Sequence, residues 1–143
     1  ARLAPEGTQA GIVNYYIGGT MPLPITGLSL GVAYDSRANG LFNGSYENAI
    51  AGYLLWQATE KLKVNSRVDY GTGSNGAHGV TVAPNAHNVK LLSTAVTLDY
   101  SLWANVISRA EFRWDHSASG QLLFLDGSEK DACSLALNVI YKF

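Results

Sequence analysis

The chain has 143 residues, which fits a single domain, and its formal net charge of −1 argues against a nucleic-acid partner. Hydrophobic residues make up 47% of the chain and charged residues only 15%, whereas charged residues are about 25% of an ordinary soluble domain. No run of about 20 apolar residues occurs, which excludes a transmembrane helix, so the low charge favours membrane-spanning β-strands in which polar and apolar residues alternate.

Seven segments carry the features of β-strands, and most of them alternate apolar and polar residues with a period of two. The first and third segments alternate least clearly, since Tyr53 and Leu55 in the third segment oppose Leu54 and Trp56. The lengths suit tilted strands that cross a bilayer, which need about 9–11 residues. The predicted strands are Gly11–Thr20, Leu28–Arg37, Glu47–Ala58, Leu62–Gly71, Val89–Leu102, Val106–Ser117 and Asp131–Phe143.

The connections between these strands alternate between short and long. The short ones are Met21–Gly27, Thr59–Lys61 and Trp103–Asn105, and the long ones are Ala38–Tyr46, Thr72–Asn88 and Ala118–Lys130. Outer-membrane barrels have short periplasmic turns and longer extracellular loops. If Phe143 lies on the periplasmic side, every short turn falls on that side and every long loop falls outside.

One face of the strands carries charges of both signs. An Arg or Lys that faced lipid at mid-membrane would cost about 2–4 kcal/mol, so the charged face is expected to line the interior of a barrel. The alternative is that these side chains only form ion pairs that hold the wall rigid. The predicted pore-lining residues are Lys63, Arg67, Asp69, Asp99, Arg109, Glu111, Arg113 and Asp115.

Aromatic residues gather near both ends of the predicted strands. Two aromatic girdles, one at each membrane surface, are expected in a transmembrane barrel. The predicted lipid-interface aromatics are Tyr34, Trp56, Tyr70, Tyr100, Trp103 and Trp114.

The last strand alternates cleanly and places Cys133, the only cysteine, on its apolar face, so no disulfide forms within the chain. The chain ends on an aromatic residue, Phe143, with Tyr141 two positions earlier. This ending resembles the C-terminal strand of outer-membrane barrels, in which a terminal Phe and an aromatic two residues before it form the assembly signal. The resemblance gives Tyr141 and Phe143 that role.

The stretch RAEFRWDHS, a loop and the final LALNVIYKF resemble the end of bacterial porins of the putative β-barrel porin family. The resemblance covers Val106 to Phe143. It implies an all-β, antiparallel up-and-down transmembrane β-barrel in the bacterial outer membrane, with no enzymatic activity and no cofactor. The implied partners are outer-membrane lipid and the barrel-assembly machinery, and no nucleic acid. Porins of this family are longer, so residues 1–143 are expected to form the C-terminal segment of a larger barrel.

Seven strands are an odd number, whereas bacterial single-chain barrels have an even number. Ala1–Gln9 has too poor a pattern for an eighth strand. Open strand edges in lipid would leave backbone groups unpaired at a cost of several kcal/mol each. We therefore expect missing strands of the same barrel, or strands of other chains, to close the sheet. A homo-oligomer is one further option.

No motif predicts catalysis or a metal site. His116 is flanked by Asp115 and Ser117, but neighbouring residues of a strand point to opposite faces, so these three cannot form a triad by themselves. His78 and His87 lack a matching cluster of cysteines or carboxylates.

Two loop segments have unusual compositions. The glycine-rich Gly71–Gly76 lacks the Lys-Ser/Thr of a phosphate loop and is read as an ordinary loop. The apolar run Leu122–Leu125 is hypothesised to fold into the lumen as a constriction or to pack on a partner protein.

Three functions remain open at this point. The main hypothesis is a porin through which small hydrophilic solutes or ions diffuse passively. The second is a non-conducting barrel that encloses or anchors a partner protein. The third is a soluble β-barrel that binds an apolar ligand, because alternation alone does not show which face is inside. The short turns, the aromatic girdles and the terminal Phe143 favour the membrane barrel.

Overall fold

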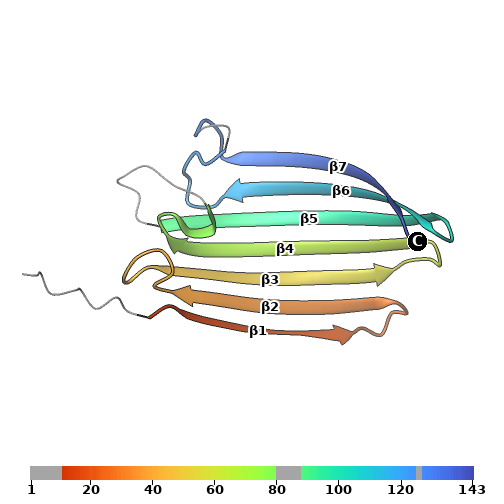
Figure 1. Cartoon of the computed structure of the whole chain (residues 1–143), viewed down its shortest axis with the longest axis horizontal. Helices are drawn as coiled ribbons and strands as arrows, with labels where there is room; N and C mark the ends of the chain where they lie inside the picture. Colours follow the sequence, from red (N-terminus) through yellow and green to blue (C-terminus); the bar gives the residue numbers. More distant parts are fainter. Residues whose placement is uncertain (1–10, 80–87, 125–126) are drawn as a thin grey trace, which may run out of the picture.

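The computed structural model describes residues 11–79, 88–124 and 127–143, which form one antiparallel sheet (Figure 1). Each strand is hydrogen-bonded to the strands that precede and follow it in the sequence, in the order β1 to β7. No helix among the described residues is long and apolar enough to cross a membrane. The elements are β1 (Val13–Pro22), β2 (Leu28–Ala38), β3 (Tyr46–Gln57), β4 (Leu62–Ser74), the short 3₁₀ helix η1 (Ala77–Gly79), β5 (Asn88–Trp103), β6 (Val106–Ser117) and β7 (Asp131–Tyr141).

The seven predicted strands are all present, and their limits differ from the predicted ones by a few residues. The largest difference is at the end of β4, which continues through Ser74, so the prediction of a loop at Gly71–Gly76 is wrong for its first four residues. Gly73 pairs with Glu47 on one side and with Val89 on the other. Ladder hydrogen bonds on both sides outweigh the poor strand propensity of glycine.

The turn after β4 explains why two glycines occur there. A Cβ on Gly73 would lie 2.3 Å from the Ala77 Cβ and 2.8 Å from the Tyr46 carbonyl oxygen. A Cβ on Gly71 would lie 2.9 Å from Nε2 of His78. The absence of side chains at both glycines therefore lets η1 fold back tightly over β4.

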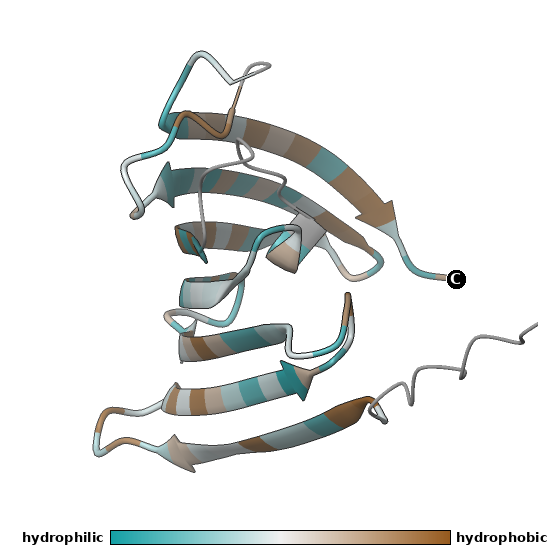
Figure 2. Ribbon diagram, turned by 90° about the vertical axis from the view of Figure 1, so that its left-hand side faces the viewer, coloured by the Kyte–Doolittle hydropathy of each residue, from teal (hydrophilic) through white to brown (hydrophobic). Residues whose placement is uncertain are grey.

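The sheet is curved across its strands, and η1 lies on its concave side (Figure 2). Directly paired residues of antiparallel strands point to the same face. We call the concave side the inner face; it is defined by the paired row Ala33, Ala51, Asp69, Ser93 and Asp115. The other side is the outer face, on which hydrophobic residues alternate with the inner polar ones along the strands.

Short turns and long loops lie at opposite ends of the sheet (Figure 1). The connections β1–β2, β3–β4 and β5–β6 form the short-turn end, where the C-terminus also lies. The connections β2–β3, β4–β5 and β6–β7 form the long-loop end. This is the arrangement expected from the connection lengths.

The sheet is one layer with little core of its own. The buried hydrophobic residues among those described are small, and Ala77 and Val89 are the fully buried ones, at 0% exposure. On the outer face, large apolar side chains are open instead, as Leu137 and Val139 show at 73% exposure each. Such a face needs a covering that the sheet itself does not provide.

Within the described residues the sheet is open. The strands β1 and β7 are its two edges, and each pairs with one neighbour. Closure of the sheet by other strands therefore stays a proposal. The segment Ala1–Gln9 lies outside the described residues.

Candidate functional site

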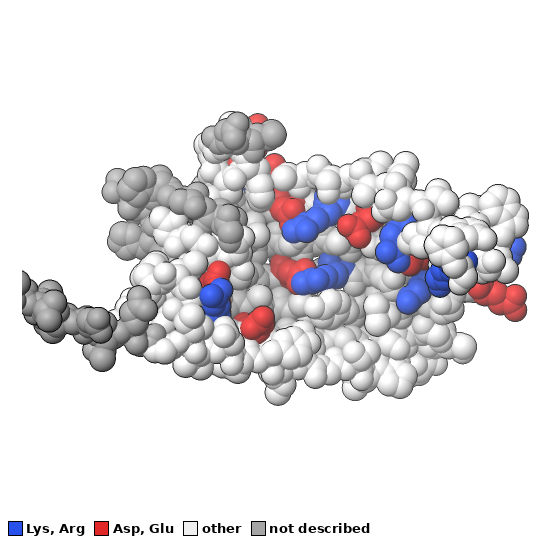
Figure 3. Space-filling view, in the orientation of Figure 1, with Lys and Arg blue, Asp and Glu red and all other residues white. Residues whose placement is uncertain are grey.

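All the predicted pore-lining residues lie on the inner face. They come from three adjacent strands in the middle of the sheet, and Figure 3 shows basic and acidic side chains gathered along this part of the face. They are Lys63, Arg67 and Asp69 on β4, Asp99 on β5, and Arg109, Glu111, Arg113 and Asp115 on β6.

The strand register arranges these charges in rows that run across β4, β5 and β6. From the long-loop end toward the short-turn end, the rows are Asp69, Ser93 and Asp115; then Arg67, Ala95 and Arg113; then Asn65, Thr97 and Glu111; then Lys63, Asp99 and Arg109. The charged residues of the first row are both acids, those of the second row are both arginines, and the third row has one charged residue, an acid. Alternation in the sequence indicates which face a residue occupies, but these rows depend on the register.

Three ion pairs join neighbouring charges. Nε of Arg67 lies 2.6 Å from Asp69, and Nε of Arg113 lies 2.9 Å from Asp115 on the same strand. Arg109 donates across to Asp99 through Nε at 2.6 Å and Nη2 at 2.8 Å, a bidentate contact. The arginine side chains are 40% to 54% exposed. Pairs this open are each worth roughly 0–1 kcal/mol in water, so they position charges more than they stabilise the sheet.

Hydroxyl groups on β5 bind the acids of β6. Ser93 donates a hydrogen bond to Asp115, and Thr97 donates one to Glu111 at 3.1 Å. On the other side of the site, the Arg67 guanidinium carbon lies 5.3 Å from the centre of the Tyr53 ring, within the range of a cation–π contact. Tyr53 was expected only as an apolar residue of a weak strand.

A hollow of about 520 Å³ lies over the middle of the inner face. It forms there because the residues of β5 at its floor, Ser93, Ala95 and Thr97, are small. The charged residues that line it are Arg67, Asp69, Glu111 and Arg113, and His78 lines it as well. The other four predicted residues, Lys63, Asp99, Arg109 and Asp115, lie outside its lining.

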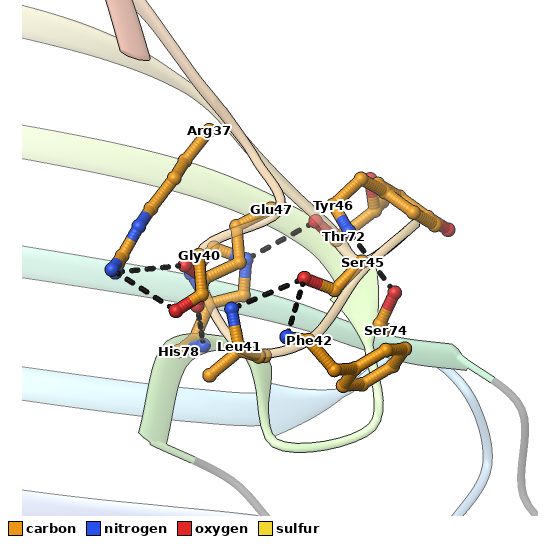
Figure 4. A network of polar contacts seen from close by, with 10 residues as sticks. All are labelled: Arg37, Gly40, Leu41, Phe42, Ser45, Tyr46, Glu47, Thr72, Ser74 and His78. Carbon is orange, nitrogen blue, oxygen red and sulfur yellow. Dashed lines mark hydrogen bonds and ion pairs between the residues drawn. The ribbon is translucent and has the colours of Figure 1, made fainter. Parts of the chain in front are cut away.

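The loop end of the inner face is held by a network around Glu47 (Figure 4). Glu47 accepts a hydrogen bond from the backbone N–H of His78 at 2.8 Å and pairs with Arg37 at 3.4 Å. Nε2 of His78 lies 3.3 Å from the Thr72 carbonyl oxygen. Sequence reasoning missed Glu47, because the residues it joins lie far apart in the chain and no motif connects them.

The loop between β2 and β3 is attached to the same network. The buried hydroxyl of Ser45 accepts hydrogen bonds from the backbone N–H groups of Leu41 and Phe42, both at 3.1 Å (Figure 4). The N–H of Tyr46 donates to the Ser74 hydroxyl at 3.1 Å. These contacts give the long-loop end of β2, β3 and β4 a defined structure.

The predicted interface aromatics lie on the outer face. Tyr34 and Tyr70 both pair with Ile50 in one row near the long-loop end, and Trp114 lies on β6 at the same end. Trp56, Tyr100 and Trp103 lie near the short-turn end, and Trp103 is 71% exposed. Their contact with lipid stays a prediction.

His116 does not join Asp115 and Ser117 in a triad. Its Nδ1 lies 2.7 Å from Asp131 on β7, and the Trp114 indole N–H donates to the same carboxylate oxygen at 3.0 Å. Asp115 lies on the inner face instead. Asp131 was missed as a partner because it meets His116 through the β6–β7 register.

At the C-terminus, the rings of Tyr141 and Phe143 meet edge to face with their centres 5.2 Å apart, and Phe143 is fully exposed. The backbone N–H of Lys142 donates to the Asn105 carbonyl oxygen at 2.8 Å, which holds this end beside the β5–β6 turn. The two aromatics are thus available to a partner, while their role as an assembly signal stays a prediction.

The apolar run Leu122–Leu125 does not contribute described residues to the hollow. The backbone N–H groups of Leu123 and Phe124 instead donate to the Glu129 carbonyl oxygen, at 2.9 and 3.0 Å. Leu125 and His87 lie outside the described residues. Among the described residues, no group of three or more His, Cys, Asp or Glu side chains could hold a metal ion.

One comparison with known proteins, that with protein families, gives a match. No curated protein and no solved structure matches the chain. A match to a protein family extends over residues 12–143, and the family is described as "Putative beta-barrel porin-2, OmpL-like". Its members are β-barrel porins, which indicates a porin role and a membrane location. With nearly its whole length matched, the chain belongs to this family of β-barrel porins.

Proposed function

We propose that the chain forms part of the wall of a water-filled channel in the bacterial outer membrane, through which small hydrophilic solutes diffuse passively. The observation that carries this proposal is the division of the sheet into two faces. Rows of ionised side chains lie on the concave face, and open apolar side chains with aromatics near both ends lie on the convex face.

The curvature supports this choice of inside and outside. A barrel that bound an apolar ligand would place its apolar residues on the concave side, whereas here the concave side carries the hollow lined by Arg67, Asp69, Glu111 and Arg113. Lipid would meet the residues of the outer face instead. Leu135 and Leu137, 69% and 73% exposed, would be covered by acyl chains.

A channel needs more strands than the described sheet has. About 8 strands enclose a barrel filled by side chains, while about 16–18 leave an aqueous lumen. We propose that further strands, from a longer form of the same chain or from other chains, pair with the free edges of β1 and β7. The long-loop end would face the cell exterior and the short-turn end the periplasm.

The test is solute uptake by liposomes that contain the protein purified in its full natural length from outer membranes. Polyols of increasing size are expected to enter at rates that fall steeply with size and do not saturate. Folding is checked separately by the shift in gel mobility on heating. Folded protein that admits no solute would contradict the proposal and favour a barrel that anchors or encloses a partner protein.

A further inference from the structure

The hollow on the inner face is lined by equal numbers of positive and negative side chains. Arg67 and Arg113 oppose Asp69 and Glu111, so the formal charges of these four residues cancel. The signs nevertheless fall in different rows, because the arginines occupy one row and the acids occupy the rows on either side. A lining of this kind favours a solute that is itself neutral overall but carries separated charges.

The two arginines are paired alike with an aspartate, and Arg67 also lies over the Tyr53 ring. They flank Ala95 in one row, and each bonds through Nε to the aspartate two residues further along its own strand. Within the described residues, neither guanidinium donates a hydrogen bond through its terminal nitrogens. Neighbouring strands are about 4.8 Å apart, so the two arginine backbones are separated by about 10 Å across a residue with a small side chain. A carboxylate between the two side chains could accept hydrogen bonds from both.

Glu111 supplies the opposite charge. It lies two residues before Arg113 on β6 and forms no ion pair among the described residues; its hydrogen bond comes from the Thr97 hydroxyl at 3.1 Å. Two residues along a strand span about 7 Å. Glu111 is therefore a carboxylate beside the arginine row that is available to a cationic group.

We propose that this hollow binds a small zwitterionic solute with one carboxylate and one ammonium group, such as a free amino acid. The carboxylate lies between Arg67 and Arg113, and the ammonium group lies against Glu111. The inference rests on the proposed function, since it requires the inner face to meet the aqueous lumen. It goes further by assigning the channel a class of solute.

The direct test is saturation-transfer NMR on the folded, full-length protein in detergent, with four probes of similar size. L-Alanine carries both charges, L-lactate only the carboxylate, 2-amino-1-propanol only the ammonium group, and 1,2-propanediol neither. Alanine is expected to bind saturably and at least about threefold more tightly than either singly charged probe, with no saturable binding of propanediol. Lactate or aminopropanol binding as tightly as alanine would overturn the proposal, as would the absence of saturable alanine binding.

Variants separate the two halves of the site. R67Q and R113Q are each expected to weaken alanine and lactate binding about three- to tenfold, whereas E111Q weakens alanine but leaves lactate unaffected. Ala95→Ile fills the space between the arginines without changing any charge, and is expected to weaken alanine binding even if the arginine variants do not fold. Lys61→Gln, in the β3–β4 turn outside the hollow, is the control for loss of one positive charge. Equal alanine binding by E111Q, A95I and the unchanged protein would overturn the site.

Uptake of propanediol by liposomes made from the same preparation tests the channel, whereas alanine binding tests the site, so the two proposals can fail separately. Uptake without saturable alanine binding would contradict the site and leave the channel standing. Alanine binding without propanediol uptake would contradict the channel, and with it the role of the site in solute passage.

Discussion

At the scale of single residues, the effect of a charged side chain on the stability of the folded protein depends on the face that it occupies. Leu137 and Asn138 are neighbours on β7, yet Leu137 lies on the outer face, and Asn138 pairs with Arg109 on the inner face. In the proposed channel the first position would meet hydrocarbon and the second would meet water. The same substitution should therefore reduce stability far more at Leu137 than at Asn138.

Leu137→Arg is expected to destabilise the folded protein by about 2–4 kcal/mol, because it places a charge in the lipid near the middle of a strand. Asn138→Arg is the matched control and should change the stability by less than about 1 kcal/mol. Urea unfolding in lipid vesicles, followed by tryptophan fluorescence, measures both. Equal losses at the two positions would mean that the faces are not divided between lipid and water.

Contacts between residues of different strands could not be predicted from the sequence. The alternation correctly places Arg67 and Arg113 on one face, but it does not show that both flank Ala95. That relation depends on the register of two strand pairs, and register is set by turn geometry and by irregularities such as the one between Ser101 and Trp103. The contact between His116 and Asp131 escaped prediction for the same reason.

At the scale of elements, the close packing of η1 depends on the glycines of the strand beneath it. Gly73 belongs to β4 and lies directly under Ala77 of η1, while Gly52 of β3 has open space where a Cβ would be. The sequence indicated a loop in this region because its glycines follow a strand but do not open a helix. The glycines instead allow a strand and a folded turn to pack closely, which no local pattern reveals.

Gly73→Ala is expected to destabilise the protein by about 1–3 kcal/mol, since the added methyl group overlaps Ala77 and the Tyr46 carbonyl. Gly52→Ala, a change of the same size in a neighbouring strand, should be neutral or slightly stabilising. The urea unfolding midpoints of the two variants test this. A midpoint for Gly73→Ala that equals that of Gly52→Ala would argue against close packing of η1 on β4.

The C-terminal residues Tyr141 and Phe143 are the predicted assembly signal. Removal of the Phe143 ring by Phe143→Ala is expected to slow insertion into bilayers catalysed by the barrel-assembly machinery, because the exposed aromatic end is lost as a contact. Lys142→Ala is the control at the neighbouring position. Insertion is measured as the fraction of heat-modifiable protein over time, and equal rates for both variants would remove Phe143 from the signal.

At the scale of the whole molecule, the number of strands limits how the sheet can close. Seven antiparallel strands leave β1 and β7 running in the same direction. Two copies inserted in the same orientation would therefore meet in parallel pairs at each seam. Closure by antiparallel pairing alone needs an odd number of further strands, which brings the total to the even number typical of bacterial barrels.

The native protein, extracted from membranes and denatured, is expected to have an intact mass well above the 15.3 kDa of the chain. A longer chain is the simplest source of an odd number of added strands. A mass near 15.3 kDa, with a closed barrel, would instead require strands from other chains.

Neighbouring cysteines introduced on the two faces test most directly whether the charged face lines an aqueous lumen. In a Cys133→Ser background, Thr97→Cys and Ser134→Cys lie on the inner face, while Val96→Cys and Leu135→Cys lie on the outer face. A charged, membrane-impermeant thiol reagent is expected to modify the inner pair, and a lipid-dissolved quencher is expected to reach fluorophores only on the outer pair. Modification of the outer pair by the aqueous reagent, with the inner pair protected, would contradict the assignment of the charged face to an aqueous lumen.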